Sequence, residues 1–226
     1  MDEVTAAPFT WSYSRLTNFE TCPRRYFETQ VKRAWPEDES PQLAWGNDVH
    51  AALAEALRSN TPLAPQYQVF EHWLEKIRRT PGEMLVEEQC RWAITREFKP
   101  TPWMSKAVWL RAIADVIKID DDVALVVDWK AGKSANVDMV QNQLVSLIVL
   151  IYFPKIEIVR SDFIWLQEDD STIQTVYRSE MADYWAQILP RVKELEKATA
   201  AKNFPPVPNR YCRSWCPVES CEYWGK

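Results

Sequence analysis

The sequence lacks the apolar segments that carry a chain into or across a membrane. It has no uncharged run of about 18 apolar residues, so no transmembrane helix is expected. Its first ten residues, MDEVTAAPFT, carry two carboxylates and have no apolar stretch of the kind that a secretory signal needs. These absences predict a cytoplasmic protein without a membrane partner.

Basic residues are too few for a uniformly basic surface. The 27 lysines and arginines are outnumbered by 32 aspartates and glutamates, which gives a formal net charge of −5. This balance argues against the class of uniformly basic nucleic-acid-binding proteins but leaves room for a local basic cleft. With 46% hydrophobic and 26% charged residues, the 226-residue chain has the composition of an ordinary globular protein of one sizeable domain.

The cysteines do not fit a disulfide framework. Five cysteines are an odd number, and no export signal accompanies them. Three follow one another in a proline-rich tail as Cys212-x3-Cys216-x4-Cys221. A zinc ion or iron–sulfur cluster would need a fourth ligand, for which Cys22, near the other end of the sequence, is the natural candidate. The spacing does not separate zinc from iron–sulfur, and unligated buried thiols are the alternative. Cys90, within a predicted strand, is interpreted as a small buried apolar residue.

Helical and strand patterns follow one another in the order of an α/β or α+β domain. The predicted helices cover about 14–28, 46–59, 66–79, 137–153 and 180–201, and the predicted strands about 84–97, 107–118, 123–129, 156–166 and 172–178. The strands show little alternation of polar and apolar residues, which indicates a sheet covered on both faces. We therefore expect a central sheet flanked by helices.

One apolar strand ends in two charged residues. In VALVVDWK (residues 123–130), Asp128 and Lys130 share a face because they stand two residues apart on a strand. A two-residue turn at 121–122 would place Asp115 opposite Asp128, with Cβ atoms about 5 Å apart. Carboxylates at that distance repel each other unless a cation lies between them, and Mg²⁺ or Mn²⁺ suits such oxygen ligands. The alternative is a chance spacing in which Lys130 simply pairs with Asp128.

Four further polar residues are candidates for the same site. His50 borders the apolar face of a predicted helix, although a lone helical histidine is more often a core or surface residue. Gln143 is polar in an otherwise apolar helix, and on its own it is best interpreted as a solvent-side residue. Glu87 and Glu88 alternate on a predicted strand, so one of them must face inwards and could be a further metal ligand. The sequence does not say which.

Six short motifs in a fixed order resemble one family. They are SYSRLTNFETCPRRYFE, GNDVH, AIADVI, VVDWKAGKS, QNQLVSL and the three-cysteine tail, and they extend from about residue 12 to residue 221. This set resembles the RecB-type branch of the PD-(D/E)xK nucleases, above all its iron–sulfur members, the CRISPR-associated exonucleases and the AddB nuclease domain. The resemblance implies a restriction-endonuclease-like core in a single nuclease domain over residues 1–226. Residues 12–30 and 203–226 would join as a cysteine cluster region.

The resemblance also implies roles for individual residues. The catalytic residues would be Asp115, Asp128, Lys130 and Gln143. One or two Mg²⁺ or Mn²⁺ ions would be held by His50, Asp115, Asp128 and the backbone carbonyl of Trp129. A [4Fe–4S] cluster, with zinc as the alternative, would be held by Cys22, Cys212, Cys216 and Cys221. Weaker candidates for DNA contacts are Arg24, Arg25, Lys133 and Arg213, each of which alone is more often a solvated charge.

Three positions depart from the family pattern. Ala114 stands where the family name has proline, and Leu147 stands four residues after Gln143 where an aromatic residue is usual. The tail spacing of three and four residues differs from that of relatives, which bears on the type of cluster more than on the nuclease assignment.

The sequence as a whole predicts a metal-dependent DNA nuclease, an exonuclease acting on single-stranded ends more readily than an endonuclease. Metal-activated water would hydrolyse the phosphodiester bond, in a bacterial, archaeal or phage-infected cell. A separate helicase, a recombination protein or a CRISPR-adaptation protein would be a compatible partner, and so would a second copy of the chain. One alternative is a catalytically silent DNA-binding or scaffold member of the same fold. Another is a zinc-stapled binding module unrelated to nucleases.

Overall fold

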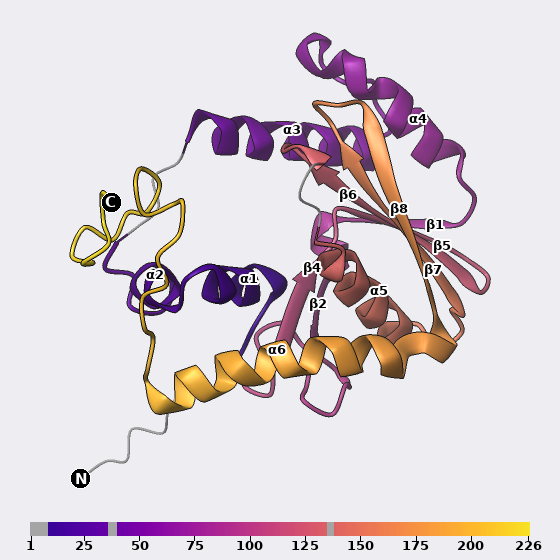
Figure 1. The fold of residues 1–226 in the computed structure, drawn as a ribbon. Helices are drawn as coiled ribbons and strands as arrows, with labels where there is room; N and C mark the ends of the chain where they lie inside the picture. Colours follow the sequence, from indigo (N-terminus) through magenta and orange to yellow (C-terminus); the bar gives the residue numbers. More distant parts are fainter. Residues whose placement is uncertain (1–8, 36–39, 135–137) are drawn as a thin grey trace. The chain divides into compact units, whose positions relative to one another are not determined.

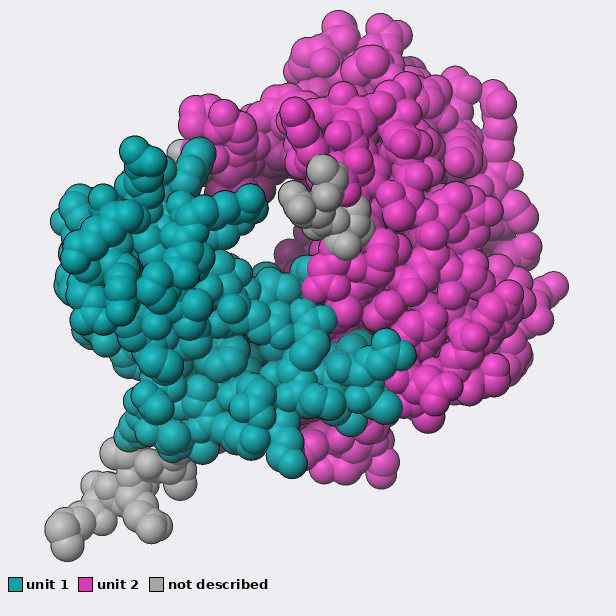
Figure 2. All heavy atoms as spheres, viewed as in Figure 1, with its two compact units in different colours: residues 1–38, 185–226 teal, residues 39–184 magenta. Residues whose placement is uncertain are grey.

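The computed structural model of the protein describes residues 9–35, 40–134 and 138–226. The extreme N-terminal residues, on which the expectation of no secretory signal rests, lie outside this part of the chain. Two compact units are present, one of residues 39–184 and the other of residues 1–38 and 185–226 (Figures 1 and 2). Compactness of contacts does not show that a unit folds independently, so the single nuclease domain stays a prediction.

A five-stranded mixed sheet forms the centre of the 39–184 unit, with strand order β1-β5-β6-β7-β8. Its strands are β1 (Glu83–Val86), β5 (Val116–Asp120), β6 (Val123–Lys130), β7 (Ile158–Trp165) and β8 (Asp170–Tyr177). Helix α5 (Val140–Tyr152) connects β6 to β7, which pair in parallel, and the other neighbours pair antiparallel. A second sheet has the order β3-β2-β4 and consists of β2 (Arg91–Ile94), β3 (Pro100–Thr101) and β4 (Leu110–Ile113).

Helices cover both faces of the five-stranded sheet (Figure 1). Helices α3 (Pro41–Ser59) and α4 (Glu71–Arg79) share one apolar core with the β6 side chains Val127 and Trp129. Because alternate residues of a strand face opposite sides, the charged residues of β6 face α5. On that side the buried hydroxyls of Ser146 in α5 and Ser161 in β7 lie 2.6 Å apart. The predicted mixed sheet flanked by helices is thereby confirmed.

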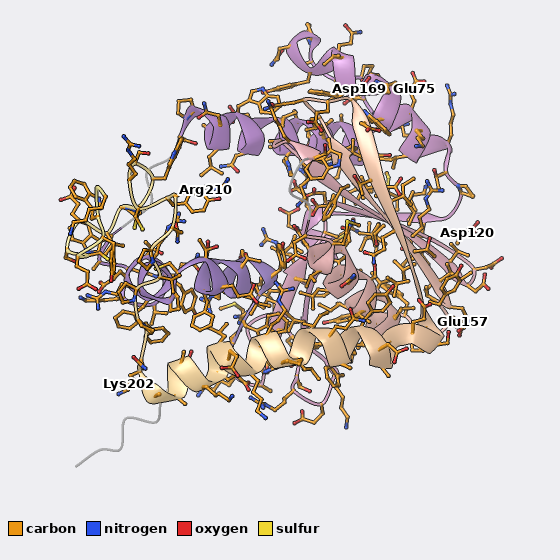
Figure 3. The ribbon with its side chains drawn as sticks, viewed as in Figure 1. Glu75, Asp120, Glu157, Asp169, Lys202 and Arg210 are labelled. Carbon is orange, nitrogen blue, oxygen red and sulfur yellow. The ribbon has the colours of Figure 1, made fainter. Side chains whose placement is uncertain are left out.

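The β5–β6 hairpin has the predicted register. Asp120 pairs with Val123 and Val116 with Val127, where the ladder ends, and the same register carried one residue further sets Asp115 against Asp128. The turn residue Asp121 has a φ of +48°, a left-handed conformation that aspartate tolerates better than most residues. Figure 3 labels Asp120 beside this turn and Asp169 at the turn between β7 and β8.

Two predicted strands are each divided in the structure. The predicted strand at 84–97 is β1 and β2 separated by a 3₁₀ turn, Glu87–Cys90, because Glu87 takes a φ of +45° and leaves the extended conformation. The predicted strand at 107–118 is β4 and β5, with a bend at 114–115 between them. Strand alternation therefore does not run through either segment.

Helix boundaries differ from the prediction where capping residues act. Helix α3 begins at Pro41 rather than near residue 46, since the Ser40 hydroxyl accepts a hydrogen bond from the Leu43 backbone N–H. The predicted helix at 66–79 is a 3₁₀ turn, Pro65–Phe70, followed by α4. The predicted start of the 137–153 helix, residue 137, lies outside the described residues.

The unit of residues 1–38 and 185–226 combines segments far apart in the sequence. Its helices are α1 (Tyr13–Thr21), α2 (Pro23–Tyr26), a π-helical turn (Phe27–Val31) and the part of α6 (Met181–Ala201) from Trp185 onwards. Cys22 takes an extended conformation between α1 and α2, which divides the helix predicted at 14–28. The rings of Phe27 and Phe204 stack with centroids 4.7 Å apart, and Arg191 donates to both carboxylate oxygens of Glu20 at 2.7 Å.

Among the described helices, none has both the length and the apolar composition that crossing a bilayer requires.

Candidate active site and cysteine pocket

The charged pair at the end of β6 is in direct contact. Lys130 Nζ lies 2.6 Å from Asp128 Oδ2 and 4.5 Å from the centre of the Phe163 ring. Asp128 is only 7% exposed, which makes it one of the few buried carboxylates in this part of the structure. Lys130 therefore compensates a negative charge that would otherwise be costly to bury.

A glutamine from the first turn of α5 joins this pair. The Lys130 ammonium donates to Gln141 Oε1 at 2.7 Å, and Gln141 Nε2 donates to Asp128 Oδ1 at 3.0 Å. The contacting glutamine is thus Gln141, two positions before the Gln143 that the motif indicates. Gln143 is half-buried on the same helix, and its positioning role stays a prediction.

Asp115 connects β6 to helix α3. Its Oδ2 accepts a hydrogen bond from the Trp129 backbone N–H at 2.7 Å, and its Oδ1 lies 3.4 Å from His50 Nδ1. Gly46, one turn before His50, permits the close approach of α3, because a Cβ at Gly46 would lie 3.2 Å from that of Ala131. The structure therefore places four predicted residues around the ends of β5 and β6, with the peptide of Trp129 among them.

Burial and charge shift the pKa values of this group. The pKa of Asp128 is raised to about 6, chiefly by burial and also by the Asp115 carboxylate, while the Lys130 ammonium acts in the opposite direction. Burial lowers the pKa of His50, but its hydrogen bond to Asp115 and the charges of Asp115 and Asp128 outweigh that effect, so the net shift is upward. The rise at Asp128 is mainly an effect of burial, whereas the rise at His50 comes from the neighbouring carboxylates.

The donor atoms of the site suit a hard divalent ion. The two carboxylates are oxygen ligands of the kind that Mg²⁺ and Mn²⁺ prefer, whereas the His50 imidazole is a nitrogen ligand that suits softer divalent metals better. In the structure these side chains are paired with one another: Asp128 with Lys130 and Gln141, and Asp115 with the Trp129 N–H and His50. Accordingly, within the described residues no three or more His, Cys, Asp or Glu side chains are arranged as a formed metal site.

Four cysteines line one narrow pocket in the other unit. They are Cys22, Cys212, Cys216 and Cys221, together with Arg24, Arg25 and residues of the proline-rich tail. The sulfur of Cys22 accepts the Val207 backbone N–H at 3.4 Å, and that of Cys212 accepts the Asn209 N–H at the same distance.

Cys90 differs from these four cysteines. It lies at the end of the 3₁₀ turn before β2 and is fully buried, as expected for a small apolar residue. Burial raises the pKa of its thiol to about 12. Burial also raises the pKa of Cys216, but there the Val218 N–H and the charge of Arg25 oppose the shift.

The four basic residues proposed for DNA contacts lie in different settings. Arg24 forms an ion pair with Glu28 at 3.1 Å, and Arg25 lines the cysteine pocket. Lys133 and Arg213 are exposed. Their contacts with DNA stay predictions.

Comparison with known proteins identifies the family. The PD-(D/E)XK nuclease superfamily matches residues 10–221, nearly the whole chain, and the protein belongs to this superfamily. Its mixed sheet flanked by helices is consistent with a restriction-endonuclease-like fold. The RecB-type branch, with its iron–sulfur members, stays a prediction.

Solved structures of similar proteins are more distant. SSO0001 is 15% identical, with a TM-score of 0.45 over 98% of this chain and 90% of that one. A putative exonuclease from Eubacterium rectale is 16% identical, with a TM-score of 0.48 over 94% of this chain and 86% of that one. Among the curated proteins no match was found.

Proposed function

We propose that the protein is a divalent-metal-dependent deoxyribonuclease, and an exonuclease on single-stranded DNA ends rather than an endonuclease. The observation that carries the proposal is the connected set of contacts at the end of β6. Asp128, Lys130 and Gln141 contact one another, and Asp115 links the Trp129 peptide to His50. Membership of a nuclease superfamily supports this chemistry, and the preference for single-stranded ends rests on the resemblance to the iron–sulfur exonucleases.

Each residue of the site has a distinct role in this proposal. His50, Asp115, Asp128 and the Trp129 carbonyl would hold Mg²⁺ or Mn²⁺. A bound ion would lower the pKa of a water molecule and neutralise charge on the phosphate. The Lys130 ammonium would orient the attacking water and stabilise the negative charge that develops on the phosphate oxygens. Gln141, and Gln143 if the motif assignment holds, would keep Lys130 and Asp128 in position.

The cysteine pocket supports a second part of the proposal, a [4Fe–4S] cluster. Four cysteine side chains are the number that such a cluster requires, and zinc with four thiolates is the alternative. The cluster would act structurally, by joining residues 12–30 to residues 203–226. A separate helicase, a recombination protein or a CRISPR-adaptation protein would supply unwound DNA in the cytoplasm of the cell.

One observation favours the alternative of a catalytically silent DNA-binding member. The acidic side chains of the site are already paired with Lys130, the Trp129 N–H and His50. A silent protein would keep these pairs and bind DNA without a metal ion.

The test is digestion of end-labelled DNA by protein purified without oxygen. Single-stranded and double-stranded substrates, and a matched RNA, would be incubated with Mn²⁺ or Mg²⁺ and wild type, Lys130→Ala or Lys106→Ala. Lys106 is exposed and belongs to none of the motifs, so its replacement serves as the matched loss of one lysine. We expect EDTA-sensitive degradation of single-stranded DNA that Lys130→Ala abolishes and Lys106→Ala retains.

The fate of the label gives the polarity and separates end-directed from internal cleavage. Absence of activity in wild type that still binds DNA would establish the silent alternative. Activity that survives Lys130→Ala would show that the site is misassigned.

A further inference from the structure

Glu87 has an unusual backbone conformation beside the candidate active site. It directly follows Val86, whose partner in the β1–β5 ladder is Val116, and its φ of +45° begins the 3₁₀ turn before β2. The Glu87 N–H donates to the Asp115 backbone carbonyl at 2.9 Å. A non-glycine residue occupies the left-handed region at a cost, so this turn is held in place by its surroundings.

The Glu87 side chain lines the same pocket as His50. The pocket is open, has a volume of about 450 Å³, and is bounded by helix α3 and by Ala131 just after β6. The Glu87 carboxylate has no hydrogen bond or ion pair with any residue in the described ranges, although the side chain is half-buried. Burial and the carboxylates of Glu88 and Asp115 raise the pKa of Glu87, while Arg58 and His50 lower it. The Glu87 carboxylate therefore borders the pocket that His50 also lines, and within the described residues it has no charged partner of its own.

Glu88, the adjacent residue, is in the opposite situation. It is exposed, and its carboxylate accepts a hydrogen bond from Arg58 Nη1 at 2.9 Å. The positive φ of Glu87 interrupts the strand, so the two neighbours no longer follow simple alternation. The charge of Glu88 is neutralised at the surface, whereas that of Glu87 is directed to the pocket.

We infer that Glu87 is a carboxylate ligand of a divalent ion that it shares with His50 and Asp115. The inference rests on the proposed metal-dependent site and adds a ligand from a third segment of the chain. If two carboxylates and an imidazole hold one ion, Asp128 can either bind a second ion or keep its pairing with Lys130. Nucleases with two metal ions use the first of these arrangements. A carboxylate in this position would repel a phosphate, so the pocket beside His50 would hold a cation before it holds DNA.

The test measures Mn²⁺ binding to the intact protein by calorimetry, with no DNA present. The variants are Glu87→Gln, its matched neighbour Glu88→Gln, and Asp115→Asn as the reference for the proposed site. We expect Glu87→Gln to weaken Mn²⁺ binding about tenfold or more, as Asp115→Asn does, and Glu88→Gln to leave it within about twofold of wild type. Glu87→Asn serves as a folding control, because asparagine tolerates the left-handed conformation better than glutamate does. It should lose Mn²⁺ affinity without a lower melting temperature.

Wild-type affinity in Glu87→Gln, with Asp115→Asn impaired, would overturn the inference and leave the proposed function standing. Equal binding by wild type, Glu87→Gln and Asp115→Asn, or no binding by wild type, would overturn both. A loss confined to Glu87→Gln and absent from Asp115→Asn would contradict the shared ion.

Discussion

At the scale of single residues, the position of Lys130 depends on three partners. Asp128 and Gln141 contact its ammonium, and the ring of Phe163 lies beneath it. Asp128 and Gln141 also contact each other, so replacing any one of Asp128, Lys130 and Gln141 removes contacts from the other two. The orientation of the Lys130 side chain is therefore a property of the group and not of the lysine alone.

The first prediction concerns the two glutamines of α5. We expect Gln141→Ala to lower kcat of the nuclease by about 10- to 100-fold with little change in KM, because it releases Lys130 and Asp128 from their relative position. Gln143→Ala is the matched variant on the same helix and should have a much smaller effect. Steady-state digestion of single-stranded DNA distinguishes them, and a larger loss in Gln143→Ala would restore the motif assignment.

A second prediction concerns the buried thiol of Cys90. Its pKa of about 12 means that it stays protonated at pH 8, and a protonated buried thiol is a poor nucleophile. Iodoacetamide should therefore leave Cys90 unmodified in the folded protein and modify it in urea, as measured by peptide mass spectrometry. Rapid modification under native conditions would show that the turn before β2 opens readily.

The residues of the site were predictable to different degrees. Asp115, Asp128 and Lys130 followed from hairpin geometry, because a two-residue turn fixes which residues lie opposite each other. Gln141 could not be chosen over Gln143, since the choice depends on where α5 begins relative to β6 and a one-residue change rotates the helix by about 100°. Glu87 could not be chosen over Glu88, because its positive φ removes the alternation on which the choice depends.

At the scale of elements, the β5–β6 hairpin sets the separation of the two acidic residues. Its turn contains Asp121 in the left-handed conformation, while the Asp122 carbonyl accepts hydrogen bonds from the Glu157 and Ile158 N–H groups at the start of β7. The turn therefore positions both the hairpin and the neighbouring parallel strand.

A third prediction follows from this turn. Asp121→Val should lower the free energy of unfolding by about 1–2 kcal/mol, because a β-branched residue is strained at positive φ. Asp122→Val keeps the same change of side chain at a position without positive φ and should cost less. Urea unfolding of the two variants measures the difference, and equal losses would mean that lost charge, not backbone strain, is responsible.

Helix α4 provides a fourth prediction, which depends on pH. The carboxylate of Glu71 accepts the Leu63 N–H at 2.7 Å and the Arg78 guanidinium at 2.6 Å, and these interactions lower its pKa. A lowered folded-state pKa stabilises the protein above the unfolded-state pKa of about 4.3, and the stabilisation is lost as the pH falls through the folded-state pKa. Glu71→Gln should therefore cost about 1 kcal/mol at pH 7 and almost nothing at strongly acidic pH.

The control for this prediction is Glu75→Gln on the same helix. Glu75, labelled in Figure 3, pairs with Arg79 at 2.9 Å, but the two side chains are 51% and 80% exposed. An exposed ion pair contributes little to the free energy of unfolding, so removing it should change stability only slightly at any pH. Thermal unfolding from pH 3 to pH 7 compares the two variants, and a pH-independent loss in Glu71→Gln would refute the assigned cause.

The existence of the elements was easier to predict than their ends. Apolar periodicity indicated α5 and the β6–β7 pair, since both are buried along most of their length. It did not indicate the breaks at Cys22, Glu87 and Asp115, which arise from single backbone conformations and not from a change in hydrophobic pattern. Cys22 and Asp115 are themselves candidate site residues, and Glu87 is the ligand inferred above.

At the scale of the whole molecule, four cysteines from distant segments line one pocket. The fifth prediction is that protein purified without oxygen contains bound iron, or zinc in the alternative. Cys216→Ser should then lose the metal and, since ligand binding to the folded state contributes directly to its stability, unfold at a lower temperature. Cys90→Ala, which removes a thiol outside the pocket, should retain the metal. Metal analysis together with absorption spectroscopy measures the bound iron or zinc in each protein. Wild type without either metal would contradict the cluster.

The joining of distant segments also has a consequence for biosynthesis. Val207, whose N–H contacts the Cys22 sulfur, is translated 185 residues after that cysteine. At about 5–20 residues per second, the first helices wait roughly 10 to 40 s on the ribosome before their packing partners are made. During that interval the thiol of Cys22 is open to oxidation. The yield of correctly assembled protein should therefore depend on the redox state of the cell while the chain is being synthesised.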